Sequence, residues 1–213
     1  MKSVALRLVL VSFFCSFISL AQEPPTIKLP APDTVGGKPL MAVLKQRKTT
    51  RTFKGDNLSP GVISNLLWAA FGVNRPDGHR TAPSAMNWQE IDIYVAMHDG
   101  VYRYNAADHT MAMVLKEDIR EKTGMQSFVK DAPINLIYIA DMAKTQRASA
   151  DERDLFTGAD CGFIAENVYL YCASEGLATV VRGSVDRASL SKILNLGGEQ
   201  KIILAQTVGY PSN

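Results

Sequence analysis

A run of seven residues, Arg47-Lys48-Thr49-Thr50-Arg51-Thr52-Phe53, combines three cations and three hydroxyl groups ahead of one aromatic ring. Arginine offers a planar fork of donors that matches phosphate oxygens, lysine adds a mobile charge, and threonine donates hydrogen bonds without adding charge. A solvated surface run explains the same composition, because short basic runs are common. This basic heptapeptide (residues 47–53) is therefore a candidate phosphate site whose assignment depends on the rest of the chain.

The first 21 residues have the composition of a secretory signal. Lys2 and Arg7 precede an apolar run from Leu8 to Leu20, and Ser19-Leu20-Ala21 provides small residues at which a signal peptidase cuts. The run is shorter than the roughly 20 residues that a membrane-spanning helix needs, so a permanent membrane anchor is the weaker alternative. We expect residues 1–21 to be cleaved and the mature protein to be exported, either periplasmic or secreted.

Charge and length limit the kind of protein that remains after cleavage. The chain of 213 residues has 23 Lys and Arg against 21 Asp and Glu, so losing Lys2 and Arg7 leaves 21 of each and a formal charge of zero. A neutral chain has no electrostatic affinity for nucleic acid, and no such partner is expected.

Residues 38–213 fit one domain. Residues 22–37 are rich in proline and predict an extended N-terminal arm able to cross a neighbouring subunit.

The cysteines predict a fold without disulfides. Cys15 lies in the signal, behind Phe13 and Phe14 rather than the small residues that lipoprotein processing prefers. Cys161 and Cys172 fall in one predicted helix, where eleven residues rise roughly 16 Å, whereas bridged Cα atoms lie within about 7 Å of each other. Packing or partners must therefore hold the fold together.

Hydrophobic periodicity and turn signals predict an α+β fold. Ser59-Pro60 is typical of a helix start, Gly72 and Gly176 are typical of helix ends, and Asp99-Gly100 predicts a hairpin turn. The expected helices cover residues 39–48, 60–71, 110–122 and 155–175, and the expected strands cover residues 91–97, 101–104, 134–140, 178–181 and 202–209.

The longest predicted helix and the polar segment before it both have features that could serve the function. Its small residues, Gly158, Gly162 and Ala165, permit close approach of a second helix, and an ordinary core helix with local packing requirements explains them equally well. The polar segment before it, Asp141 to Asp154, is a candidate lid over a pocket. Both interpretations depend on the tertiary structure.

Other familiar chemistries lack their motifs. The chain has neither the glycine fingerprint of a dinucleotide fold nor a Walker loop. His79, His98 and His109 are not held at the spacing of metal ligands, so no metal site is expected. Ser84 lacks the glycine elbow of a hydrolase nucleophile. These absences exclude the most common alternatives to a phosphate-bearing organic cofactor.

Four segments that occur in a characteristic order carry a family resemblance. They are residues 47–53, Arg80-Thr81-Ala82-Pro83-Ser84-Ala85-Met86-Asn87, Gly176-Leu177 and Val208-Gly209-Tyr210-Pro211. With these segments the chain resembles the FMN-dependent nitroreductase family. It is most similar to the short azoline-dehydrogenase-like (SagB-type) members, which are grouped with enzymes that oxidise azoline rings in peptide natural products. The resemblance extends from about Leu40 to the end of the chain.

The resemblance implies a nitroreductase-like fold, in which helices flank a central mixed, mainly antiparallel sheet. It also implies an intertwined homodimer with two FMN molecules at the subunit interface, each held by residues of both chains. Neither subunit alone then makes a complete site.

The resemblance further implies three groups of FMN-binding residues. Cations of the first motif reach the phosphate and the pyrimidine side of the flavin, the second segment approaches the ring from the partner chain, and a third loop points a backbone amide at flavin N5. The matching residues are Arg47, Lys48, Thr49 and Arg51; Pro83, Ser84, Ala85 and Asn87; and Arg182 and Gly183.

The activity implied is that of an exported FMN-dependent oxidoreductase, which passes hydride through N5 to or from a nitroaromatic- or quinone-like molecule in a ping-pong cycle. Reduced flavin carries negative charge near N1 and O2, so a neighbouring cation stabilises it. This chemistry needs an open face above the ring more than an acid or base, and no catalytic side chain is assigned. Two alternatives stay open: an azoline-oxidase-like dehydrogenase or oxidase acting on a peptide or small molecule, and a flavin-binding dimer without turnover.

Two points set this sequence apart from its relatives. NAD(P)H is a cytosolic reductant, so the electron donor of an exported member is an open question. The chain also stops at Asn213, whereas many relatives continue past the Gly-Tyr-Pro signature with a basic pair that clamps the phosphate. We therefore expect weaker FMN retention, with Arg182 as a candidate additional phosphate ligand.

Overall fold

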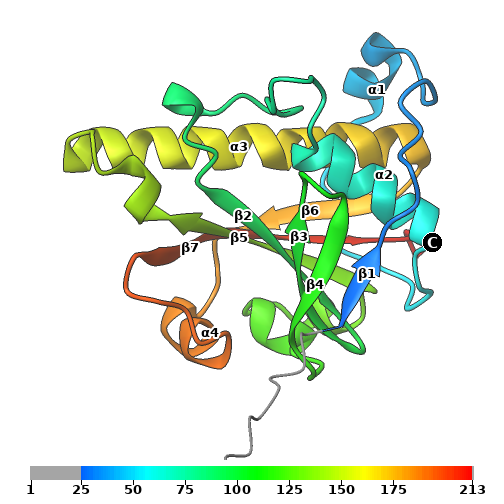
Figure 1. Ribbon diagram of the computed structural model, residues 1–213. Helices are drawn as coiled ribbons and strands as arrows, with labels where there is room; N and C mark the ends of the chain where they lie inside the picture. Colours follow the sequence, from blue (N-terminus) through cyan, green and yellow to red (C-terminus); the bar gives the residue numbers. More distant parts are fainter. Residues whose placement is uncertain (1–24, 213) are drawn as a thin grey trace, which may run out of the picture.

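A seven-stranded sheet organises residues 25–212, the part of the chain that the computed structural model describes (Figure 1). The strand order is β1-β4-β3-β2-β5-β7-β6, and every described pair of neighbours is antiparallel. The strands are β1 (Thr26–Lys28), β2 (Ile91–Met97), β3 (Gly100–Asn105), β4 (Thr110–Leu115), β5 (Ile134–Asp141), β6 (Ala178–Arg182) and β7 (Gln200–Gly209). The α+β class is confirmed, whereas the predicted signal at residues 1–21 lies outside the described residues.

Helices cover both faces of this sheet (Figure 1). The α-helices are α1 (Leu40–Gln46), α2 (Pro60–Phe71), α3 (Ala150–Glu175) and α4 (Arg187–Ile193), and the 3-10 helices are η1 (Ala85–Asn87), η2 (Arg120–Thr123), η3 (Ser127–Lys130) and η4 (Met142–Thr145). None of the helices in the described range 25–212 is long and apolar enough to cross a membrane.

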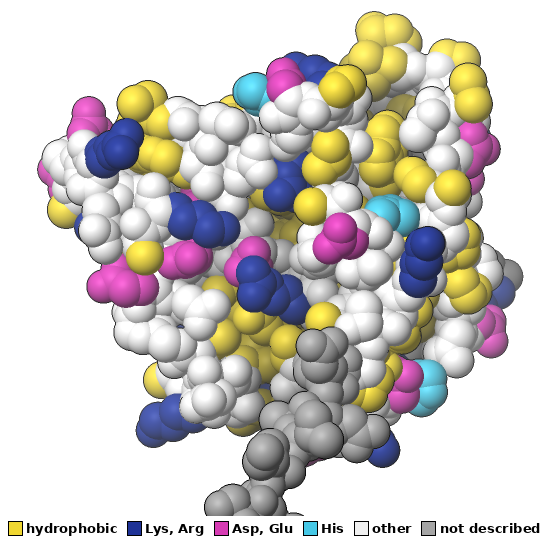
Figure 2. Space-filling model, viewed as in Figure 1, with side chains coloured by type: hydrophobic (Ala, Val, Ile, Leu, Met, Phe, Trp, Pro, Cys, Tyr) yellow, Lys and Arg dark blue, Asp and Glu magenta, His cyan; other side chains and the backbone are white. Residues whose placement is uncertain are grey.

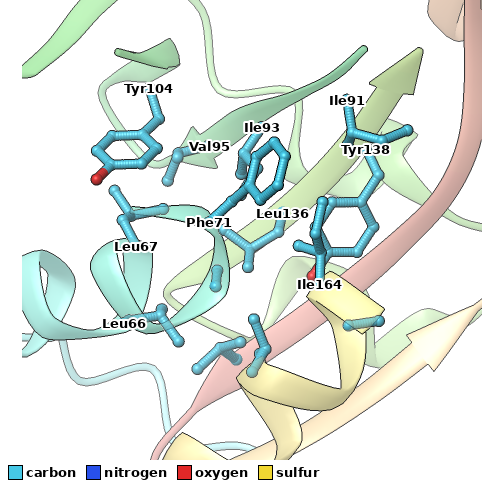
Figure 3. Close-up of a cluster of buried hydrophobic side chains, with 14 of the residues drawn as sticks. Leu66, Leu67, Phe71, Ile91, Ile93, Val95, Tyr104, Leu136, Tyr138 and Ile164 are labelled. Atoms are coloured by element: carbon cyan, nitrogen blue, oxygen red, sulfur yellow. The ribbon is translucent and has the colours of Figure 1, made fainter. Parts of the chain in front are cut away.

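The central strands are buried on both faces, which explains the apolar run predicted for residues 134–140. Leu136 and Tyr138 of β5 pack with α2 and α3, as Figure 3 shows, and Ile137 and Ile139 pack on the opposite side with Leu190 of α4. Alternate residues of a strand point to opposite faces, so a strand covered on both sides must be apolar throughout. These two layers fix β5 as the centre of the core.

Helix α3 is 26 residues long and begins before the predicted residue 155. Ser149 and Glu152 form a capping box, a sequence signal that places the start at residue 150. Gly176 ends the helix in the left-handed conformation (φ 72°), as predicted. Cys161 and Cys172 are both buried and free, which confirms that they do not pair with each other.

The predicted helix over residues 110–122 is wrong. Thr110 to Leu115 form strand β4, which pairs with β3 on one side and β1 on the other, and residues 120–123 form only a 3-10 turn. The spacing of Met111, Leu115 and Ile119 fits a helix, but pairing with two neighbouring strands satisfies the backbone of β4 and overrides that local pattern.

The described part of the predicted N-terminal arm packs on the protomer's own sheet. Thr26 to Lys28 pair with β4 and form the edge strand β1. In the β2–β3 hairpin, Met97 pairs with Gly100, so the two turn residues are His98 and Asp99 and the predicted turn shifts by one position. Gly100 supplies the positive φ there, at 153°.

Candidate active site

The basic heptapeptide directly follows α1 and lies beside the edge strand β6. The backbone N–H of Thr50 donates to Thr179 O (3.0 Å), and Phe53 forms a β-bridge with Pro211. An extended segment alternates its side chains between two sides. The heptapeptide therefore presents two different sets of side chains to its surroundings.

One set lines a cavity of about 630 Å³. Lys48, Thr50 and Thr52 contribute to its wall, together with Tyr169 of α3 and Thr179 of β6. A cavity of this size is typical of a small-molecule or cofactor site. The hydroxyl and ammonium groups of the wall give it the donors that a phosphate requires.

Tyr169 anchors the other set. The Arg47 guanidinium lies 5.3 Å from the centre of the Tyr169 ring, and Thr49 Oγ1 lies 3.1 Å from Tyr169 Oη. The same hydroxyl accepts a hydrogen bond from Val181 N (3.0 Å), which ties the heptapeptide to β6. Sequence reasoning missed Tyr169, since a tyrosine inside a helical pattern is indistinguishable from a core residue.

The cations of the heptapeptide have no acidic partners in the described part of the chain. Arg47, Lys48 and Arg51 make no salt bridge there, and Lys48 and Arg51 are exposed. Three neighbouring cations without a counter-charge repel one another and attract an anion. The donor set therefore fits the phosphate of FMN.

The structure corrects the expectation for the Arg182 side chain. Arg182 is 3% exposed, and its guanidinium donates to Thr123 O (2.7 Å), Asn135 Oδ1 (3.0 Å) and Thr207 Oγ1 (3.0 Å). Burial lowers its pKa to about 10. These bonds hold the side chain inside the protein, so it is not available as the phosphate ligand that we expected.

Gly183, the residue after β6, has open space around it. A Cβ at this position would meet only Leu204 Cδ2, at 3.9 Å, and the residue is exposed. Packing within the protomer thus does not require a glycine here. The backbone at Gly183 is therefore open to the approach of a flat ring such as that of FMN.

The second predicted segment, Pro83 to Asn87, forms a strained loop. Met86 and Asn87 have positive φ values (52° and 54°), as does Gln89 (48°), and the Met86 side chain is 80% exposed. Non-glycine residues rarely adopt this conformation, and it persists only where the surroundings enforce it. The loop therefore needs anchors.

Two buried carboxyl groups anchor the loop. Asp160 of α3 accepts a hydrogen bond from Ala85 N (2.8 Å), and Glu90 accepts one from Ser84 Oγ (3.3 Å). Glu90 is fully buried and Asp160 is 2% exposed. Burial raises the pKa of both groups, and the neighbouring Asp160 adds to the shift of Glu90. A raised pKa favours the protonated form of each carboxyl group. Sequence reasoning missed both residues.

Along α3, the two halves of the predicted site are far apart. Tyr169 contacts the heptapeptide, whereas Asp160 contacts the 83–87 loop. These residues are separated by nine positions of one helix, which corresponds to a rise of about 14 Å. One protomer thus brings the heptapeptide together with Thr179 and Val181 of β6 but not with the loop.

The segment 141–154 is fixed by hydrogen bonds rather than open. Arg153 donates to Thr145 Oγ1 (2.9 Å) and to Met142 O (2.9 Å), and both Met142 and Thr145 are buried. Residues 150–154 form the first turns of α3. In this structure the candidate lid is a packed connection.

Comparison with known proteins identifies the family. Residues 44–210 match the model of the Nitroreductase family, and the chain belongs to that family. A candidate nitroreductase of Methanocaldococcus jannaschii is 32% identical over 181 residues, covering 80% of this chain and 91% of that protein.

Solved structures agree with this assignment. The crystal structure of a candidate nitroreductase of Ralstonia eutropha JMP134 is 43% identical with a TM-score of 0.85, covering 88% of this chain and 90% of that one. A candidate NADH oxidase of Clostridium acetobutylicum shares the fold at 24% identity and a TM-score of 0.57, covering 80% and 88%. The chain is therefore a nitroreductase-family oxidoreductase by descent and by fold.

The buried carboxyl pair predicts an unusual pH dependence of stability. A carboxyl group whose pKa is raised on folding keeps its proton longer in the folded state, so stability falls as the pH rises through the interval between the unfolded and folded pKa. Glu90→Gln removes one such group and retains an acceptor for Ser84. We expect the variant to gain stability relative to the wild type as the pH rises above about 4, the pKa of an unperturbed glutamate.

Urea denaturation at a series of pH values measures this difference. Glu117→Gln, an exposed substitution after β4, serves as the control and should follow the wild type throughout. A constant difference in stability between Glu90→Gln and the wild type at every pH would contradict the raised pKa of Glu90.

Proposed function

We propose that the chain is an exported FMN-dependent oxidoreductase that acts as a homodimer on a small organic substrate, such as a nitroaromatic- or quinone-like acceptor. The observation that carries the proposal is the set of heptapeptide cations that make no salt bridge in the described residues, of which Lys48 lines the cavity of about 630 Å³. FMN, when bound, supplies hydride transfer at N5. Arg47, Lys48 and Arg51 would hold the phosphate and offset negative charge on the pyrimidine side.

The rest of the site would position and expose the ring. The backbone at Gly183 leaves room for a flat ring, and the anchored 83–87 loop would cover the same ring from the partner subunit. The separation of about 14 Å along α3 supports a site shared by two chains. Outward-facing apolar side chains support a dimer as well: Leu155 (67% exposed) and Phe163 (47% exposed) on α3, and Met41 (77% exposed) on α1.

The small residues of α3 fit the same proposal. A Cβ at Gly158 or Gly162 would have no atom outside the helix backbone within 4 Å, so these glycines are not required by packing inside the protomer. Of the two interpretations made from the sequence, close approach of a second element is the better supported. We propose that this exposed face of α3 belongs to the dimer interface.

Purification of the mature chain followed by absorbance spectroscopy tests the cofactor. We expect a flavin spectrum, or its recovery on adding FMN, at a size-exclusion mass of two protomers. Anaerobic titration with NADH or NADPH then tests the reductive half-reaction by loss of the oxidised flavin absorbance. A colourless protein that FMN cannot reconstitute contradicts the proposal.

The same preparation separates the alternatives. Flavin that NAD(P)H does not reduce, but that a peptide or small-molecule donor does, favours the azoline-oxidase-like dehydrogenase. Flavin that no donor reduces favours a binding protein without turnover. The mass of the protein recovered from the cell envelope and the medium tests cleavage of residues 1–21.

A further inference from the structure

A second cavity, of about 340 Å³, lies on the side of the sheet where α2 ends and β2 begins. It shares no lining residue with the cavity beside the heptapeptide. Its polar lining includes Arg80, Gln89, Arg103 and Lys144, with one carboxylate, Asp92. Figure 2 shows Lys and Arg side chains beside acidic ones across this face.

Arg80 is the central cation of this cavity. Its guanidinium stacks 5.0 Å from the centre of the Phe71 ring and donates to Phe71 O (3.1 Å) and Gln89 Oε1 (2.8 Å). These partners are neutral, and Arg80 makes no salt bridge within residues 25–212. Burial lowers its pKa, and the nearby Tyr104 and Asp92 oppose that shift. A half-buried guanidinium without an anionic partner is costly unless an anion completes it.

The other charged groups leave the cavity net positive. Asp92 pairs with Arg103 at 3.3 Å, so those two charges offset each other. Lys144 donates to Gln89 O (3.0 Å), again a neutral partner. Arg80 and Lys144 therefore remain as two cations without a salt-bridge partner in the described residues. Both donate hydrogen bonds to Gln89, which follows the 83–87 loop.

We propose that this cavity binds a small carboxylate with a compact apolar body. Nε and Nη1 of Arg80 already donate to Gln89 and Phe71, so Nη2 is the group that would donate to the carboxylate, and Lys144 adds a second charge. The apolar part of the lining comes from Phe71, Ile91, Ile93, Ala106 and Ala112. The cavity volume is near the lower end for ligand sites, which sets the size at about that of a single ring.

Isothermal titration of the FMN-loaded mature protein with benzoate and benzamide tests the proposal. The two probes have the same shape and differ in charge, so we expect benzoate to bind and benzamide to bind at least tenfold more weakly. Arg80→Gln should weaken benzoate binding at least tenfold, and Lys144→Ala should weaken it several-fold. Lys144 is exposed, so its variant tests the site even if Arg80→Gln fails to fold.

Two controls separate this cavity from other cationic surfaces. Lys116→Ala, which follows β4 at the opposite end of the β3–β4 hairpin, should leave benzoate affinity unchanged. Lys54→Ala, an exposed cation outside the lining of this cavity, should also leave it unchanged. Equal binding of the two probes, no binding of benzoate, or loss of binding in either control variant overturns the proposal.

Discussion

Replacing Arg51 by alanine is expected to weaken FMN binding by roughly 1.5 to 3 kcal/mol, the range for losing a hydrogen bond to a charged group. That loss corresponds to a roughly 10- to 150-fold rise in the dissociation constant. Arg51 is exposed and makes no salt bridge in the described chain, so nothing in the protomer depends on its charge. The free energy of unfolding without FMN should therefore change little.

Fluorescence titration of the apoprotein with FMN measures this effect. Arg147→Ala removes an exposed cation outside the heptapeptide and should leave the affinity unchanged. If Arg51→Ala binds FMN as well as the wild type, the heptapeptide is a solvated surface run and its assignment as a phosphate site is wrong.

Replacing Arg182 by alanine is expected to lower the free energy of unfolding by roughly 2 to 5 kcal/mol, the combined range for truncating a large buried side chain and leaving buried partners unpaired. The side chain connects η2, β5 and β7 through Thr123, Asn135 and Thr207. Thr207 Oγ1 also donates to Asn135 Oδ1 (2.6 Å), so the loss would disturb a connected buried network.

Chemical denaturation of the apoprotein measures the loss, with the exposed Arg75→Ala as the control. Arg182→Lys keeps the charge but not the planar fork, and we expect an intermediate loss. A stable Arg182→Ala variant with strongly reduced FMN affinity would instead show that the arginine acts on the cofactor directly. We expect instead that Arg182→Ala lowers the free energy of unfolding of the apoprotein, and that any loss of FMN affinity follows from this folding defect.

The sequence predicted the elements that have local signals. Ser59 caps α2, its Oγ accepting from Val62 N at 3.3 Å, and Gly176 closes α3, because caps depend only on residues a few positions apart. The strand β5 was predicted because its apolar residues form one continuous run, which is also a local signal. The helix over residues 110–122 failed, because its strand partners β3 and β1 come from elsewhere in the chain.

In the candidate site, too, the sequence predicted the local features and missed the contacts between residues distant in sequence. The residue types of the heptapeptide and the order of the four motifs pointed to an FMN-binding nitroreductase-family chain, and the family is confirmed. The buried partners of Arg182, the carboxyl pair of Glu90 and Asp160, and the cavity around Arg80 join residues distant in sequence.

By itself, then, the sequence determined the family and the chemistry available to it, since side-chain types and local backbone preferences are properties of short segments. The tertiary structure decided which of those side chains are free to bind. It buried Arg182 among neutral partners, left Arg51 exposed, and separated the heptapeptide from the 83–87 loop. The physical reason is that burial and distance across the fold depend on long-range packing, which no short segment encodes.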